Sequence, residues 1–263
     1  MPALWASLES IDPALIDWRP RDLRFGFGLY LAGWIMAGVG VLGQPHVMIR
    51  AMAIDSPQHI TRARRLYFAW YIAFATAAIL VGLACRVLLT ASDTFDSELA
   101  LPRLAQTTLP EVLVGLILAG LFAATISTAD SQILTCSAAL TQDLFPQLSE
   151  PYILTKAATV VVTAAVVLVV LAGHQSVFVL VVLAWSALAS SLGPLLALRA
   201  LGMPVPSVLG VVMMMSGLGV VLVWRYVLEF SDPIYEVLPG MAAGFLVYGV
   251  ARIGFKCEPR TQP

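Results

Sequence analysis

Charged side chains are scarce in this sequence: only 12% of its 263 residues are Asp, Glu, Lys or Arg. A typical soluble domain carries about 25%. The two signs nearly cancel, because 15 basic residues face 16 acidic ones and the net charge is −1. So few charges of either sign exclude a disordered chain, a nucleic-acid-binding domain and an ordinary cytosolic enzyme.

Cysteine and histidine are also rare, and their spacing excludes two further kinds of site. They are Cys85, Cys136, Cys257, His46, His59 and His174. An odd number of scattered cysteines does not predict a disulfide framework, and histidines this far apart do not form a zinc motif. The sequence also contains no nucleotide-binding loop and no nucleophile–base pair, so it does not predict an enzyme.

Apolar residues are abundant: they form 59% of the sequence and give a mean hydropathy of +0.88. They gather into blocks close to the length of about 20 residues that a membrane-spanning helix needs. Seven blocks cover residues 25–49, 66–90, 110–138, 156–173, 177–198, 206–228 and 236–254. Residues 160–172 lack the alternation of β-barrel strands. The sequence therefore predicts an all-α integral membrane protein with about seven transmembrane helices, whose partner is the lipid bilayer and not nucleic acid.

The distribution of positive charge predicts the orientation of the chain, because cytoplasmic loops are enriched in Lys and Arg. The loop between the first two blocks contains Arg50, Arg62, Arg64 and Arg65, whereas the next loop is acidic, with Asp93, Asp96 and Glu98. We expect residues 1–24 to be an extracellular segment and residues 255–263 a cytoplasmic tail. An outside N-terminus without a signal sequence is typical of the second half of a longer inner-membrane protein.

The first block is interrupted by glycine and proline. It contains four glycines and then the run Gln44-Pro45-His46. Proline removes a helical hydrogen bond, and such interrupted segments indicate the binding site of a transporter. A glycine packing face with a proline kink would give the same pattern, so both interpretations stay open. Gly193-Pro194 in the fifth block predicts a second broken helix.

The third block carries a stripe of small, hydroxyl-bearing residues. Ala124, Ser127, Thr128, Ser131 and Thr135 follow helical spacing and therefore share one face. Their hydroxyl and carbonyl oxygens suit a weakly held hard cation, but small residues also favour helix–helix packing, and spacing alone does not decide between the two. Asp130 lies about 120° from the centre of the stripe. A carboxylate at that depth is expected to be paired, solvated or functional.

Several motifs taken together resemble the sodium/solute symporter family, and within it the bacterial sodium/proline symporters. These motifs, in chain order, are Gly38-Val-Gly-Val-Leu-Gly-Gln-Pro-His46, Arg50-Ala-Met-Ala53, Ser127-Thr-Ala-Asp-Ser131, Cys136-Ser-Ala-Ala-Leu-Thr-Gln-Asp-Leu144, Ala184-Trp185, Gly193-Pro194 and Tyr235-Glu-Val-Leu-Pro-Gly240. The resemblance implies a five-plus-five fold of two inverted repeats. Residues 25–198 would be the helices of the second repeat and residues 199–254 two accessory transmembrane helices.

The resemblance also implies a function: sodium-coupled transport of a small organic solute such as proline or another amino acid. It places the sodium-binding oxygens at the carbonyl of Ala124 and the hydroxyls of Ser127 and Thr128. Asp130 and Ser131 are candidates for a gating or ion-linked role. The alternative is a truncated or split half-transporter, inactive alone and completed by a separate N-terminal half, or a structural partner in the membrane.

The expected substrate pathway departs from the proline transporters at two positions. Ala37 and Val41 stand where those transporters carry a Trp and a Tyr, and Pro45 is retained. Trp34, one turn before Ala37, is the candidate to replace one of the missing aromatic side chains.

Overall fold

The computed structural model describes residues 2–17, 19–20, 23–89, 96–145, 152–172 and 176–254. Within these ranges the chain forms ten α-helices and no strand, and seven helical segments are long and apolar enough to cross a membrane. This confirms the predicted all-α architecture with seven spans. The predicted tail 255–263 and Asp93 lie outside the described residues.

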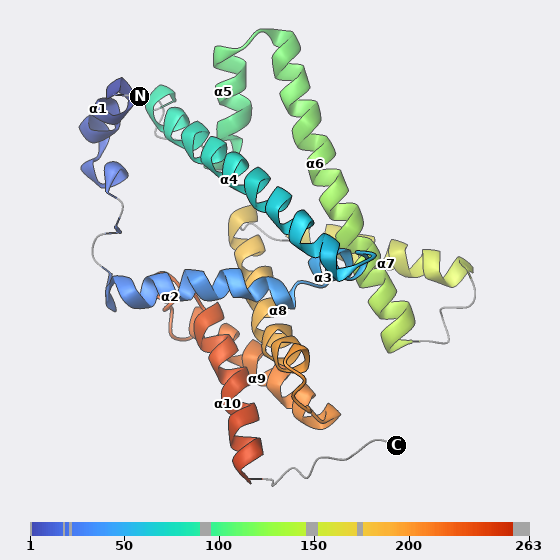
Figure 1. The fold of residues 1–263 in the computed structure, drawn as a ribbon. Helices are drawn as coiled ribbons and strands as arrows, with labels where there is room; N and C mark the ends of the chain where they lie inside the picture. Colours follow the sequence, from blue (N-terminus) through green and yellow to red (C-terminus); the bar gives the residue numbers. More distant parts are fainter. Residues whose placement is uncertain are drawn as a thin grey trace. The chain divides into compact units, whose positions relative to one another are not determined.

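The chain divides into two compact units, and the helices of both are labelled in Figure 1. The first unit comprises residues 1–18 and 54–174. Its α-helices are α1 (Pro2–Ile11), α4 (Pro57–Leu88), α5 (Ala100–Thr108), α6 (Glu111–Ala138) and α7 (Tyr152–Ala172). The second unit comprises residues 19–53 and 175–263. Its α-helices are α2 (Gly26–Val39), α3 (Pro45–Met52), α8 (Val177–Ala200), α9 (Ser207–Tyr226) and α10 (Val237–Gly254).

Helix α4 in the first unit starts earlier than the hydropathy predicts. It begins at Pro57, so Arg62, Arg64 and Arg65 lie in its first turns and not in a loop. Proline is favoured at the first position of a helix, where its missing N–H would have no partner. Arg, Ala and Gln, which follow this proline, favour the helical conformation although they contribute little hydropathy. Helix α4 is therefore longer than its apolar part, and the additional turns at its start carry the arginines.

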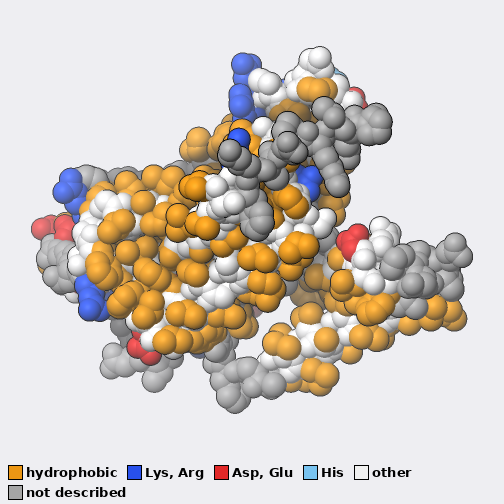
Figure 2. Space-filling model, turned by 90° about the horizontal axis from the view of Figure 1, so that it is seen from below, with side chains coloured by type: hydrophobic (Ala, Val, Ile, Leu, Met, Phe, Trp, Pro, Cys, Tyr) orange, Lys and Arg blue, Asp and Glu red, His pale blue; other side chains and the backbone are white. Residues whose placement is uncertain are grey.

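The spans of the first unit have largely open surfaces. Helix α6 continues through a π-helical segment (Ala139–Leu144) to form one long span, and none of its most apolar stretch is buried. It meets α7 through the hydroxyls of Ser137 and Thr159, which lie 2.8 Å apart. Among the described side chains on the face of the whole chain seen in Figure 2, hydrophobic ones dominate and charged ones are few. Such a surface is suited to contact with lipid.

In the second unit, α8, α9 and α10 pack closely at glycine residues. A Cβ at Gly217 of α9 would collide with the backbone carbonyl of Ser190 in α8, and one at Gly240 of α10 would collide with the Ser190 side chain. Helices approach this closely when small residues line their interface. The three helices therefore form the core of this unit, and α2 packs across α8 and α10 (Figure 1).

The second helix break predicted from Gly193-Pro194 is wrong. Helix α8 runs unbroken from Val177 to Ala200 with Pro194 inside it. The proline leaves the Ser190 carbonyl without its usual helical donor, and that carbonyl lies directly against Gly217. The ring of Pro194 fits beside Gly244, where a Cβ would come within 2.9 Å of it. Tight packing on two neighbouring helices accommodates the proline without a break.

Candidate functional site

The predicted sodium-binding residues lie on one continuous stretch of α6. The hydroxyl of Thr128 donates a hydrogen bond to the Ala124 carbonyl at 3.0 Å, which brings two of the three predicted oxygens together. Ser131 donates in the same way to the Thr128 carbonyl at 2.9 Å. Because a hydroxyl and a carbonyl oxygen each keep lone pairs after such a bond, both oxygens remain able to bind a cation.

Ser127 and Asp130 are two further candidate residues on α6. Both side chains are exposed, and no hydrogen bond joins either to another described side chain or carbonyl. Ser127 is next to Thr128 and on the same face, whereas Asp130 leaves the helix on a different side. Among the described residues, no three His, Cys, Asp or Glu side chains come together as metal ligands. The oxygens that the stripe itself presents are neutral hydroxyls and carbonyls.

The predicted helix break in the first span is confirmed. Helix α2 ends at Val39 and continues as a short 3-10 helix, η2 (Gly40–Gly43). Gln44 then adopts an extended conformation, with φ −98° and ψ 102°, and Pro45 begins α3. The residue before a proline is disfavoured in the helical region, so Pro45 forces the break onto Gln44.

Trp185 of α8 holds the two sides of this break. Its indole Nε1 donates to the Ala37 carbonyl at 3.0 Å, and its own carbonyl accepts from the Gln44 side-chain amide at 3.2 Å. Gln44 is 2% exposed, so its amide would lack a partner without this bond. We call these two hydrogen bonds the Trp185 clasp. The clasp joins backbone before the break to the residue at the break.

A close backbone contact supports the clasp. A Cβ at Gly43 would lie 2.7 Å from the Cα of Ala189, which is shorter than any real contact of that kind. Only glycine therefore allows η2 to approach α8 at this point. The glycine and proline pattern in the first span thus forms both a packing face and a helix break, and its role in a transporter binding site stays a prediction.

The four predicted substrate-pathway residues lie around this break but differ in exposure. The Ala37 side chain is 9% exposed and belongs to an apolar cluster with Ala189, Tyr235 and Met241. Val41 and Pro45 are half-buried. Trp34 is 44% exposed and stacks on Tyr235, with ring centroids 4.9 Å apart. Of these four, Trp34 presents the largest exposed apolar surface.

A buried polar cluster adjoins the break. Glu236 is fully buried, and its Oε1 accepts from Nη1 of Arg225 at 2.7 Å and from the Ser186 hydroxyl at 3.0 Å. Its Oε2 has no partner among the described residues. The neighbouring Tyr235 donates its hydroxyl to the Val182 carbonyl at 3.0 Å. Burial, with the nearby Glu236 charge adding to it, raises the pKa of Tyr235 to about 12.

Sequence reasoning noted Trp185, Gln44 and Glu236 within motifs but did not connect them. Gln44 precedes Trp185 by 141 positions, so no spacing rule brings them together. A polar amide in an apolar block beside a proline was the available signal. The structure places the predicted sodium residues in the first unit and the predicted substrate-pathway residues in the second. Each set is therefore a local arrangement, and its role in binding stays a prediction.

Comparison with known proteins agrees with the motifs. A model of the sodium:solute symporter family matches residues 23–201. The chain is 29% identical to the high-affinity proline transporter PutP of Bacillus subtilis over 92% of this chain and 52% of that protein. It is 28% identical to a sodium/proline symporter of Salmonella typhimurium over 91% of this chain and 48% of that protein.

A third relative is the osmoregulated proline transporter OpuE of Bacillus subtilis, which is 26% identical over 96% of this chain and 54% of that protein. The chain thus spans about half the length of the curated relatives it matches. No solved structure matches it.

Proposed function

We propose that this chain, which belongs to the sodium:solute symporter family, supplies the sodium-binding oxygens of a transporter that moves a small organic solute together with sodium. The family consists of sodium-coupled transporters and not of enzymes. Within the proposal, residues 25–198 are the second repeat of the five-plus-five fold and residues 199–254 are accessory spans. The solute is proline or another amino acid, which is what the similarity to proline transporters supports.

The observation that carries the proposal is the arrangement of oxygens on α6. The Thr128 hydroxyl and the Ala124 carbonyl lie 3.0 Å apart, and Ser127 adds a third oxygen from the next position on the same face. Hydroxyl and carbonyl oxygens are suitable ligands for hard cations. Sodium here is a transported ion, so a site built from few neutral oxygens has the advantage of releasing it readily.

We expect Thr128→Ala to weaken sodium binding because it removes one of few ligands. In a transporter completed with the first half of a relative, this variant should raise the sodium concentration needed for half-maximal uptake severalfold. The apparent affinity for solute should fall mainly at low sodium, because the coupling between the two sites is reciprocal. Ser127→Ala should act in the same direction. The measurement is sodium-dependent uptake of labelled proline into proteoliposomes.

Thr125→Ala is the matched control for this experiment. Thr125 lies on the same helix and donates to the Leu121 carbonyl at 2.8 Å, but it is about 100° away from the centre of the stripe. It should leave sodium dependence unchanged, and Asp130→Asn should change expression or rate more than sodium dependence. Unchanged sodium dependence in both Thr128→Ala and Ser127→Ala would mean that the stripe serves packing alone.

The substrate is tested separately by competition. Unlabelled amino acids are added in turn to the uptake assay, and inhibition by proline is compared with inhibition by larger and by charged amino acids. Ala37 and Val41 are smaller than the Trp and Tyr at the matching positions of proline transporters. We therefore expect a bulkier amino acid to compete at least as well as proline. Selective inhibition by proline would contradict that expectation and assign proline as the substrate.

A second candidate function is that of a half-transporter that is inactive alone. Two observations favour it: the chain spans about half of its relatives, and the oxygen-bearing face of α6 is exposed. Broken helices in a membrane need surrounding protein to enclose a solute. We expect no sodium-driven uptake from proteoliposomes containing this chain alone, and uptake when a separate N-terminal half is added. Uptake by the chain alone would rule out this candidate.

A further inference from the structure

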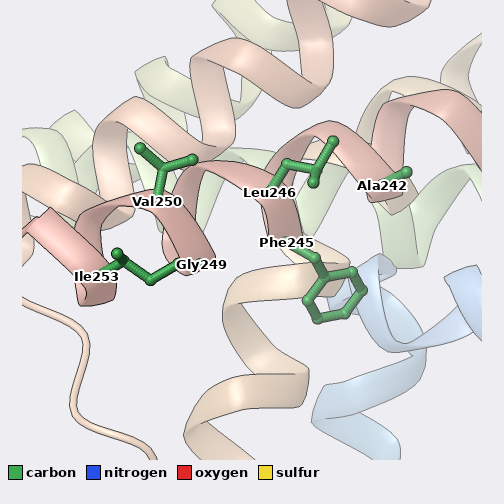
Figure 3. A pocket seen from close by; sticks show the side chains of 6 residues that line it. All are labelled: Ala242, Phe245, Leu246, Gly249, Val250 and Ile253. Atoms are coloured by element: carbon green, nitrogen blue, oxygen red, sulfur yellow. The ribbon is translucent and has the colours of Figure 1, made fainter.

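The second unit has an apolar groove between the start of α9 and the end of α10. Its volume is about 1050 Å³, and its lining includes Pro204, Pro206, Leu209, Val212 and Val247. A smaller hollow of about 440 Å³ lies beside it along α10. Leu246 and Val250 line both and are raised together on one side of the helix in Figure 3. The two hollows are therefore adjoining channels separated by one ridge of side chains.

The second channel is formed where α10 lacks a side chain. Gly249 lines the 440 Å³ hollow, and a Cβ built there would meet nothing within 4 Å. The wall consists otherwise of Ala242, Phe245 and Ile253 with the two ridge residues (Figure 3). Two adjoining apolar hollows on either side of a ridge suit a pair of hydrocarbon chains.

The large groove has a cationic end. Arg252 lines it and lies in the last turn of α10. No ion pair or hydrogen bond joins its guanidinium to another residue of the described part of the chain. Nearby, Arg199 donates from Nη2 to the Val205 carbonyl at 2.6 Å and so fixes the loop that closes the groove. The described acidic residues of this unit, Glu229, Asp232 and Glu236, all lie in the connection from α9 to α10, at the other end of these helices.

The length of the channels fits one leaflet of a bilayer. Together the two hollows reach along α10 from Ala242 to Ile253, which is about 16 Å on a helix, and the large groove takes up about 9 Å of that length, from Leu246 to Arg252. The hydrocarbon core of a bilayer is about 30 Å thick. An arginine at the helix end and apolar lining for half the membrane thickness therefore match the headgroup and the acyl chains of a single lipid.

We propose that this groove is a binding site for a diacyl phospholipid with an anionic headgroup. Its phosphate contacts Arg252, one acyl chain lies between α9 and α10, and the other lies in the channel at Gly249. Arginine pairs well with phosphate because its planar fork of donors matches the oxygens. The site depends on the chain being a multi-pass membrane protein and not on its transport activity.

The test is a titration of dioleoyl phosphatidylglycerol into the detergent-solubilised full chain, followed by native mass spectrometry. Dioleoyl phosphatidylcholine, which has the same acyl chains and no net charge, is titrated in parallel. Arg252→Gln should weaken phosphatidylglycerol binding about fivefold and phosphatidylcholine binding less, because the choline cation offsets the charge of its phosphate, whereas Arg252→Lys should retain most of the phosphatidylglycerol binding. The control Arg64→Gln removes an exposed arginine from the first unit and should have no effect.

The acyl-chain part of the site is tested by filling one channel. Gly249→Leu should weaken the binding of both lipids. Gly219→Leu, at another glycine with open space around it that is absent from both linings, should not. Equal losses from Arg252→Gln and Arg64→Gln would show non-selective electrostatic attraction and overturn the proposal. A lipid-free dimer as the dominant species, dissociated by Gly249→Leu, would assign the groove to a second copy of the chain instead.

Discussion

Among single side chains, Glu236 is notable because its carboxyl group has no access to solvent. It is fully buried, and Arg225 is its only ionic partner among the described residues. We expect Arg225→Leu to lower the free energy of unfolding by about 3–5 kcal/mol, because it leaves a buried carboxylate unpaired. The double variant Arg225→Leu/Glu236→Leu should recover much of that loss. Reversible unfolding in mixed micelles measures both, and a double variant no more stable than the single one would contradict the pairing.

Tyr235 makes the stability of the protein depend on pH in the alkaline range. Its pKa is raised to about 12, whereas an unfolded tyrosine ionises near 10. The stabilisation is complete below about pH 10 and is lost as the pH rises towards 12, because the unfolded phenol ionises first. We expect the free energy of unfolding to fall across this range in the wild type and less in Tyr235→Phe. If the free energy of unfolding falls equally steeply with pH in the two proteins, folding does not raise the pKa of Tyr235.

At this scale the sequence predicted residue types better than contacts. Ala124, Ser127 and Thr128 could be placed on one face because helical spacing is local, and their common helix confirms that placement. The contact between Gln44 and Trp185 could not be predicted because the residues lie on different helices. Ala37 was assigned to the substrate pathway because it matches a position in the proline transporters that the sequence resembles. Its burial could not be predicted in this way, because it depends on Ala189 and Tyr235 far along the chain.

Among the helices, the contact between α8 and α9 offers a sharp comparison of two glycines. A Cβ at Gly217 collides with the Ser190 carbonyl, whereas one at Gly219 meets nothing within 4 Å. Gly217→Ala should therefore destabilise the protein by about 1–3 kcal/mol. Gly219→Ala should stabilise it by roughly 0.5–1 kcal/mol, because alanine is the better helix former. Thermal unfolding in detergent measures both, and equal shifts would mean that α8 and α9 are not in close contact.

Hydropathy predicted those helices that are apolar along their length and missed those that are not. The seven spans agree with the seven blocks because about 20 apolar residues give a strong signal. Helices α1 and α5 are short and were not predicted, and α4 extends into Arg62–Arg65, where hydropathy is low. The break at Gln44 was predicted from Pro45, but Pro194 gave a false signal because Gly244 of α10 leaves room for its ring and Gly217 of α9 leaves room for the Ser190 carbonyl.

At the scale of the whole chain, the untested prediction is its orientation in the membrane. In a variant without native cysteines, a cysteine at Asp96 should react with an impermeant maleimide added outside the cell. A cysteine at Arg64 should react only after the membrane is opened. The physical reason is the excess of arginine at the end of α3 and the start of α4, which favours the cytoplasmic side. The opposite labelling pattern would reverse the predicted topology.

The Trp185 clasp has a mechanical consequence. One residue of α8 is attached at two points, through its ring to Ala37 and through its backbone to Gln44. A single attachment would let α2 pivot around it, but two attachments fix the angle as well as the distance. Turning one helix about its own axis must then stretch at least one of the two bonds. The angle at the break between α2 and α3 is therefore fixed relative to α8, so that a change in this angle would have to move α8 as well.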